Sequence, residues 1–311
     1  MHKIQLKNPS LLLCGRTVPV VILGIFLFIG SGNSLANGFM DIAIAAGHED
    51  NVSRGFLDRD ITSSTFHRTQ FTGGKLFQPF INTSISLSAT GSYQGFVDQH
   101  GFNAMGISTS INAQHKFGMG AYTPRILFNF SAAHENSRGA ERDRNLYTIN
   151  VGYFQRLTAG LSINLGMLDQ TSRGTDEPRV DFDQLPYRST RPTDPMDYSN
   201  SIVYGGMDYV FENNWQVSFS YQYYDGYIVS SAKPPVQLFR YAQAVALDPA
   251  FNDLHLMYLM ESKADMWSSG LSVPLTSNTA IDLSYSWQIF EAENVGDYDN
   301  AQFSISLVHQ F

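Results

Sequence analysis

The segment around His134 contains the residue types that hydrolases use for nucleophilic attack. His134 is followed by Ser137 and Asn145, and a histidine can take the proton of a serine hydroxyl while a third polar group orients the ring. The spacing speaks against this chemistry, because residues three apart on a strand point to opposite faces and cannot share a proton. We therefore expect His134 to lie at a polar boundary and not in a catalytic site.

A set of charged residues is better placed to act on a solute. Most of them fall on the polar positions of segments that alternate between polar and apolar residues, which predicts side chains that face water inside a barrel. On a lipid-facing side, Lys or Arg would cost about 2–4 kcal/mol at mid-membrane, so their polar positions support this assignment. The predicted lumen-lining residues are Arg68, Lys116, Arg125, Arg156, Asp208, Glu212 and Asp282.

The elements that would position these side chains are alternating segments of about ten residues, which are typical of transmembrane strands. Tight connections follow the even-numbered segments and mostly longer ones follow the odd-numbered segments. This pattern predicts an all-β fold, a transmembrane antiparallel up-and-down β-barrel of about twelve strands with both termini in the periplasm. An even number also closes the barrel without an unpaired edge in lipid. The twelve candidates lie near 39–47, 64–77, 81–96, 103–117, 124–136, 145–157, 160–170, 200–212, 215–229, 263–275, 279–291 and 301–311.

A soluble β-sandwich would also alternate, with its apolar side facing a core. The polar side of these segments is rich in Ser, Asn, Gln and Thr, which are costly to bury without hydrogen bonds. Aromatic residues also gather near the ends of the segments, as they do at the two membrane interfaces of barrels. Both observations favour the barrel over the sandwich.

The last residues, NAQFSISLVHQF (300–311), alternate strictly and end on Phe311. This ending resembles the C-terminal signal of Gram-negative outer-membrane β-barrel proteins, although His309 stands where a hydrophobic or aromatic residue is usual. The resemblance implies residence in the outer membrane, contact with its lipid and lipopolysaccharide, and insertion by the barrel-assembly machinery through the C-terminal strand.

The first 36 residues have the features of a secretory signal peptide. They contain Lys3, Lys7 and Arg16 but no acid, then an apolar run from Val18 to Ile29 and small residues before Ala36. We expect cleavage after Ala36, export by the Sec pathway, and a mature barrel domain of residues 37–311. The loss of these three basic residues would change the net charge from −8 to about −11. Such a charge opposes binding to nucleic acid.

Three Ser-Arg-Gly sequences recur where odd-numbered segments end, and they contain Arg54, Arg138 and Arg173. One interpretation is turn chemistry, because glycine adopts the positive φ that such turns need. The other is an outer-rim set of arginines that contacts lipopolysaccharide phosphates or an anionic solute.

Two longer stretches add little known chemistry. Residues 175–199 are rich in acids and prolines, but they lack the spacing of a calcium-binding loop. Residues 230–262 combine a helix-forming part, 236–247, with an apolar part, 254–260, which should not stand in water alone. The apolar part would fold into the barrel mouth, extend the tenth segment, or meet a partner. No metal site and no cofactor are expected, and the only cysteine, Cys14, lies in the leader.

Three functions remain open from the sequence. The first is a narrow pore or transport channel for small polar solutes, with residues 230–262 as a gate. The second is a non-conducting surface or export-partner barrel that presents its long outer loops. The third is an outer-membrane lipase or protease. Outer-membrane phospholipases are twelve-stranded and carry a Ser two residues after the catalytic His, but here that position is Asn136, which disfavours an enzyme.

Overall fold

The computed structural model describes residues 37–175, 194–234 and 236–311. The predicted signal peptide and most of the acidic stretch 175–199 lie outside these residues. No helix in the described part of the chain is long and apolar enough to cross a membrane.

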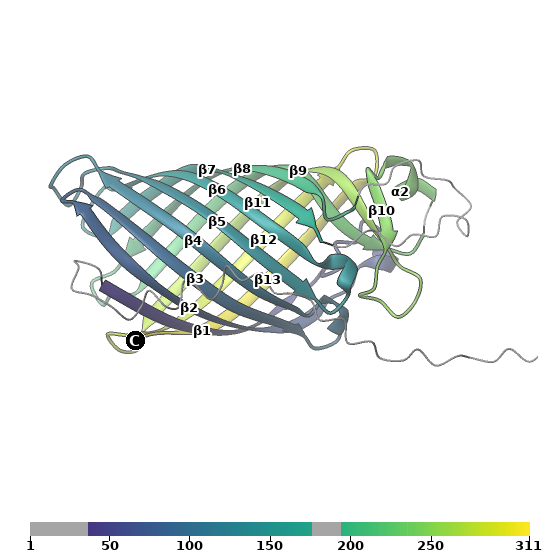
Figure 1. The fold of residues 1–311 in the computed structure, drawn as a ribbon, viewed down its shortest axis with the longest axis horizontal. Helices are drawn as coiled ribbons and strands as arrows, with labels where there is room; N and C mark the ends of the chain where they lie inside the picture. The colour runs from purple at the N-terminus through teal and green to yellow at the C-terminus, as the bar shows by residue number, and fades with distance from the viewer. Residues whose placement is uncertain (1–36, 176–193, 235) are drawn as a thin grey trace, which may run out of the picture. The chain divides into compact units, whose positions relative to one another are not determined.

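The described residues form a closed antiparallel β-barrel (Figure 1). Twelve strands follow one another around the wall, with β9 paired to β11 and β13 paired to β1. The strands are β1 (Asn37–Glu49), β2 (Ser64–Phe80), β3 (Thr83–Phe96), β4 (Ala104–Lys116), β5 (Arg125–Ser137), β6 (Arg144–Arg156), β7 (Leu161–Gly174), β8 (Tyr198–Val210), β9 (Gln216–Ala232), β11 (Leu256–Pro274), β12 (Thr279–Ala292) and β13 (Gly296–Gln310). The predicted all-β, antiparallel up-and-down barrel of twelve strands is confirmed.

The two ends of the barrel differ. One end carries the tight turns, the start of β1 and the C-terminus, and we call it the short-turn end (Figure 1). The other, the long-loop end, carries three short 3-10 helices, η3 (Asp58–Asp60), η4 (His100–Phe102) and η5 (Ala140–Arg142), together with α2 (Val236–Tyr241) and β10 (Ala244–Leu247).

The wall follows the alternation in the sequence. In β13, Ile305 and Leu307 face outward with 45% of each residue exposed, whereas Ser304 and Ser306 have the opposite parity. On the inward side, hydrogen bonds between hydroxyl groups link neighbouring strands. Ser88 and Ser110 are one such pair, with their oxygens 2.8 Å apart. The outward apolar belt therefore suits lipid, and the inward hydroxyls need water or one another.

Aromatic side chains form a cluster on the outward face of the barrel. Trp267 and Trp287 stack on the outward face with ring centroids 5.4 Å apart, and Tyr221 lies 5.5 Å from Trp267. Their cross-strand positions, Trp267 opposite both Trp287 and Tyr221, bring them together. Such rings with a polar edge are suited to the membrane–water interface.

The structure corrects the sequence prediction in two places. The second predicted segment, 64–77, is too short: β2 continues to Phe80, so the turn lies at residues 81–82. The pairing of β2 with β3 shifts register between Phe77 and Phe80. In the stretch 236–247, only Val236–Tyr241 is helical, because Ala244–Leu247 pairs with β11. Cross-strand hydrogen bonding there outweighs the helix propensity of the sequence.

Candidate functional site

The long-loop end is occupied by an extension of the barrel wall, which we call the mouth segment (described residues within 226–262). β9 and β11 remain paired beyond the points where their other neighbours in the wall end: β8–β9 pairing ends at Asp225 and β11–β12 pairing at Ser262. β10 then joins the free edge of β11. The sequence left three roles open for the apolar residues 254–260: folding into the barrel mouth, extending the tenth segment, or meeting a partner. The structure combines the first two, because these residues lengthen β11 and pack inside the mouth.

Gly226 is the joint where β9 leaves the wall. Its φ is 158°, and a Cβ atom placed there would lie 2.8 Å from the Cα atom of Asn200. The Asn200 side chain accepts a hydrogen bond from the Tyr227 backbone nitrogen at 2.8 Å. A side chain at position 226 would therefore displace β9 from β8.

Both faces of the mouth segment are buried. One face packs against inward side chains of β12 and β13, where the rings of Phe290 and Tyr298 stack with centroids 5.0 Å apart. The other face, which includes Met257 and Leu259, packs against Met196 and Tyr198 at the start of β8. The main hydrophobic core of the molecule thus lies inside the barrel mouth and not in the wall.

The mouth segment also reaches the opposite side of the barrel. The loop between β3 and β4 lies five strands from β9 in one direction and five from β11 in the other, which makes it diametrically opposite. There the ring of Phe102 contacts the ring of Phe251 edge to face, with centroids 5.5 Å apart. The Phe251 ring stacks on the His255 ring, with centroids 3.9 Å apart. The segment therefore crosses the whole mouth.

A buried ion pair fastens this crossing. Arg142, in η5, donates two hydrogen bonds to the Asp248 carboxylate at 2.9 and 2.7 Å and a third to the Ser231 hydroxyl at 2.6 Å. The Asp248 side chain is fully buried and that of Arg142 is 13% exposed. Burial alone would raise the pKa of Asp248, but the guanidinium of Arg142 holds this pKa below its ordinary value. The carboxylate is therefore charged at neutral pH.

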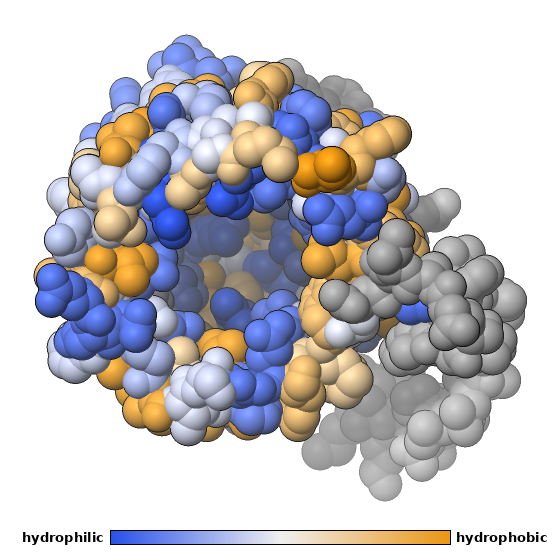
Figure 2. All heavy atoms as spheres, turned by 90° about the vertical axis from the view of Figure 1, so that its left-hand side faces the viewer, coloured by the Kyte–Doolittle hydropathy of each residue, from blue (hydrophilic) through white to orange (hydrophobic). Residues whose placement is uncertain are grey.

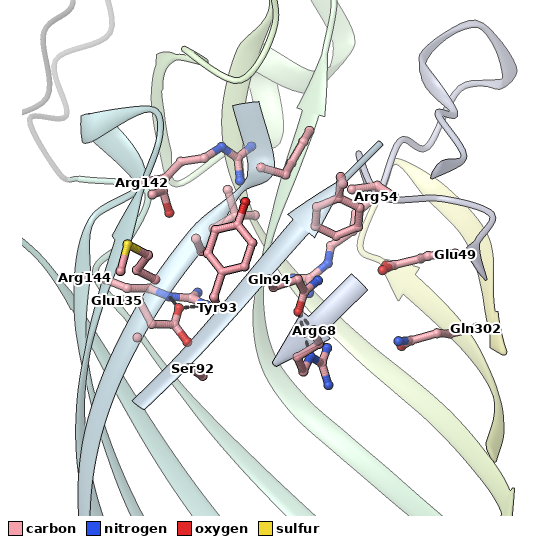
Figure 3. Close-up of a pocket in the computed structure, with 18 of the residues that line it drawn as sticks. Glu49, Arg54, Arg68, Ser92, Tyr93, Gln94, Glu135, Arg142, Arg144 and Gln302 are labelled. Atoms are coloured by element: carbon pink, nitrogen blue, oxygen red, sulfur yellow. Dashed lines mark hydrogen bonds and ion pairs between the residues drawn. The ribbon is translucent and has the colours of Figure 1, made fainter. Parts of the chain in front are cut away.

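A cavity of about 360 Å³ lies next to the mouth segment, and Val229 and Met196 form part of its lining. Its polar lining comes from strands β1, β2, β3, β5, β6, β12 and β13, from the loop after β1 and from η5 (Figure 3). Charged and amide side chains predominate: Arg54, Arg68, Arg142, Arg144, Glu49, Glu135, Gln94, Gln288, Asn300 and Gln302.

The acidic side chains of this cavity are already engaged. Glu135 pairs with Arg144 at 2.6 Å, and Arg144 also donates to the Tyr198 hydroxyl at 2.7 Å. Glu49 accepts a hydrogen bond from the Asn300 amide at 3.1 Å. In Figure 3, Glu135 and Arg144 lie on one side of the cavity and Glu49 on the other, with Arg54 and Arg68 between them.

The sequence-predicted lumen residues divide between the two ends of the barrel. Arg68 lines the cavity, whereas the others on the inward parity lie near the short-turn end. Lys116 stands opposite Arg125, and Ser162 lies between Arg156 and Asp208 in one cross-strand row. The remaining two are Asp282, opposite Ser306 in β13, and Glu212, which lies in the turn after β8.

The three rim arginines are not brought together. Arg54 points into the cavity, Arg138 is exposed on the loop after β5, and Arg173 lies on the outward parity of β7 opposite Asn145. The three copies of the Ser-Arg-Gly sequence therefore lie in three different environments.

His134 lies on the outward face of β5, where its Nδ1 is 3.1 Å from the Asn145 side-chain oxygen. Ser137 has the inward parity, and its backbone nitrogen donates to Asp143 at 2.7 Å. Asn136, on the same face as His134, donates to Asp143 at 2.9 Å. No hydroxyl of this segment thus reaches His134, and no group of three metal-binding side chains occurs in the described parts of the chain.

Sequence reasoning missed Glu49, Glu135, Arg142 and Arg144 as lining residues. Glu49, Glu135 and Arg144 continue the inward parity of their strands to the rim, so extending the alternation would have found them. Arg142 lies in η5, outside any alternating segment, and its partner Asp248 is 106 residues further along the chain. No sequence signal pointed to that pair.

No family model and no curated protein matches the sequence. Among solved structures, the chain is similar to an outer-membrane channel from Pseudomonas putida F1, with a TM-score of 0.53 and 9% identity over 91% of this chain and 98% of that one. It is also similar to a KdgM porin in complex with disordered oligogalacturonate (TM-score 0.45, 11% identity, 87% and 99% covered). The transport unit of the Escherichia coli autotransporter AIDA-I gives a TM-score of 0.47 at 10% identity, with 92% and 94% covered. The chain has the fold of Gram-negative outer-membrane β-barrels.

Proposed function

We propose that the protein is a narrow outer-membrane channel for small polar solutes. The observation that carries this proposal is the hollow interior seen from the short-turn end, where mainly hydrophilic residues surround a central opening (Figure 2). Inward hydroxyl and amide side chains suit water and hydrogen-bonding solutes. A twelve-strand barrel also lies between the filled eight-strand barrels and the open sixteen-strand porins.

The outward apolar belt supports a place in the outer membrane, in contact with lipid and lipopolysaccharide. Export through the leader 1–36, and insertion through the strand that ends at Phe311, fit this location. The short-turn end, which carries both ends of the barrel chain (Figure 1), is then the periplasmic end.

The mouth segment acts as the gate of this channel. It crosses the long-loop end, and its docking rests on two hydrophobic faces and the Arg142–Asp248 pair. The competing function, a surface that presents an apolar platform to a partner, loses its main support. Leu256, Met257, Tyr258, Leu259 and Met260 are all buried within the molecule, at most 4% exposed.

Cysteine labelling during single-channel recording tests the proposal. In a Cys14→Ser background, Ser110→Cys places a thiol on the inward face of β4, and Ile111→Cys places one on the outward face. We expect stepwise conductance from the folded protein, blocked by a charged methanethiosulfonate at position 110 and unaffected at 111. Absence of steps from folded protein, or equal block at both positions, would refute a channel through the lumen.

A further inference from the structure

The cavity beside the mouth segment carries a charge opposite to that of the whole protein. The chain has a formal net charge of −8, but four arginines and only two glutamates line the cavity. A concave site lined mainly by one sign of charge attracts ions of the opposite sign.

Two of these arginines have no acidic partner within the described residues. The Nε and Nη2 atoms of Arg68 both donate to the side-chain oxygen of Gln94, at 3.0 and 2.7 Å. This amide is neutral, so it orients the guanidinium without compensating its charge. Arg54 forms no salt bridge in the described parts of the chain. Arg142 and Arg144, by contrast, are neutralised by Asp248 and Glu135.

Arg54 is held in place by a rigid loop. Its φ of 53° is a left-handed conformation that is uncommon for residues other than glycine. The flanking side chains fix it: Asn51 accepts a hydrogen bond from the Gly55 nitrogen at 2.9 Å, and Ser53 donates to the Asp60 carbonyl at 2.6 Å. Both flanking residues are 1% exposed. The buried polar groups of the loop are hydrogen-bonded to one another, and the Arg54 side chain is directed into the cavity. Arg54 is therefore preorganised for binding, because its position is fixed before a ligand arrives.

The remaining lining defines the chemistry of the ligand. Guanidinium groups bind carboxylates and phosphates through paired hydrogen bonds. The side-chain amides of Gln94 and Gln302 offer hydrogen bonds to hydroxyl groups. Asn300 binds one oxygen of the Glu49 carboxylate, and the other oxygen accepts a hydrogen bond from a donor on the ligand. The volume of about 360 Å³ lies near the lower end of small-molecule sites. The ligand is therefore small, anionic and rich in hydroxyl groups.

We propose that Arg54 and Arg68 form a binding site for small hydroxylated carboxylates inside the barrel, beside the mouth segment. The proposal rests on the proposed channel, for which the site would select the solute. The carboxylate lies between the two guanidiniums, and the hydroxyl groups face the amides and Glu49. The cationic pair at the short-turn end, Lys116 and Arg125, lies outside this lining and attracts anions only through its general field.

The test measures binding by titration calorimetry of the full chain in detergent. The probes are sodium gluconate, neutral sorbitol of similar size, and inorganic phosphate. We expect saturable binding of gluconate, no binding of sorbitol, and weaker binding of phosphate. Arg54→Gln and Arg68→Gln should each weaken gluconate binding by about tenfold or more, the effect of one lost charged hydrogen-bonding partner. Lys116→Gln is the matched control and should change the Kd by less than about twofold, as expected of a distant, screened charge.

Several results would overturn the site. They are no gluconate binding by folded protein, equal binding of sorbitol or of phosphate, and equal losses in Lys116→Gln and Arg68→Gln. Folding of every variant is checked by the resistance of the barrel to unheated dodecyl sulfate. Conductance separates the two proposals. Binding without conductance refutes the channel and keeps the site, whereas conductance without gluconate binding refutes the site and keeps the channel.

Discussion

The two ends of the barrel interior differ in packing: one end is hollow and the other is filled by the mouth segment. At the short-turn end, the lumen is hollow (Figure 2) and charges such as Lys116 and Arg125 stand opposite each other across neighbouring strands. At the long-loop end, the chain folds back and buries aromatic rings, an ion pair and a small cavity. Local strand alternation therefore builds the barrel wall, whereas contacts between residues distant in sequence build the mouth segment.

The largest expected effect is at the ion pair of the long-loop end. Asp248→Ala leaves the buried Arg142 charge unpaired, and breaking such a pair costs about 3–5 kcal/mol. We expect the mouth segment to detach, with a larger mean conductance and rapid proteolysis within residues 233–255.

The matched control is Lys233→Ala in the same segment, which leaves the contact of Asp253 with buried His255 intact. Lys233 pairs with Asp253 at 3.1 Å, but more than half of each side chain is exposed, and exposed pairs contribute little. This variant should behave as the unmutated protein does. If both variants conduct alike, the buried pair does not hold the segment.

A pH dependence follows from the same residue. The folded-state pKa of Asp248 is lowered, so its stabilisation is present above the unfolded value of about 3.9 and is lost as pH falls through the folded value. The difference in open probability between the unmutated protein and Asp248→Asn should stay constant from neutral pH to about pH 4 and shrink below it. Single-channel recording across this range checks the prediction, and a difference that grows in acid would contradict it.

Ion selectivity sharpens the contrast between the ends. Arg68→Gln removes an uncompensated charge from a cavity of about 360 Å³, whereas Lys116→Gln removes one from the hollow short-turn end of the lumen (Figure 2). We expect the anion-to-cation permeability ratio to fall several-fold in the first variant and by less than about twofold in the second, where water and salt screen the charge. Reversal potentials in a salt gradient provide the measurement. A larger effect of Lys116→Gln would move the selective region to the short-turn end.

The smallest expected effect concerns a buried hydroxyl in the mouth core. The Tyr298 oxygen has no hydrogen-bond partner among the described residues, so Tyr298→Phe removes a polar atom without breaking a bond. The free energy of unfolding should change by less than about 1 kcal/mol, in contrast to about 3–5 kcal/mol for Tyr298→Ala, which leaves a cavity. Denaturant melts of both variants decide between these values. A large loss in Tyr298→Phe would reveal a partner for this hydroxyl.

The wall could be predicted from sequence because each strand must alternate to face lipid and water. In β13, for example, Ile305 and Leu307 on one parity and Ser304 and Ser306 on the other fix both the strand and its orientation. The mouth segment could not be predicted in detail, because its strands have two buried faces and lack a clean period. The helical composition of residues 236–247 gave the wrong structure for Ala244–Leu247.

The candidate site was predicted only in part, for a related reason. Arg68 was found because it follows the strand alternation, and Arg54 was noticed only as part of a repeated sequence. Their meeting in one cavity depends on the loop between Asn51 and Asp60, whose buried hydrogen bonds link side chains to backbone. A sequence pattern does not contain such a geometry.

The most direct test of the gated channel is the single-channel conductance of the full chain with and without the tip of the mouth segment. Residues 233–255 are replaced by a short turn that joins Ala232 to Leu256, which are already paired across β9 and β11. We predict steady conductance steps from both proteins and a conductance several-fold larger after the deletion. Equal conductance in the two proteins would contradict the gate, and silence from both, when folded, would contradict the channel itself.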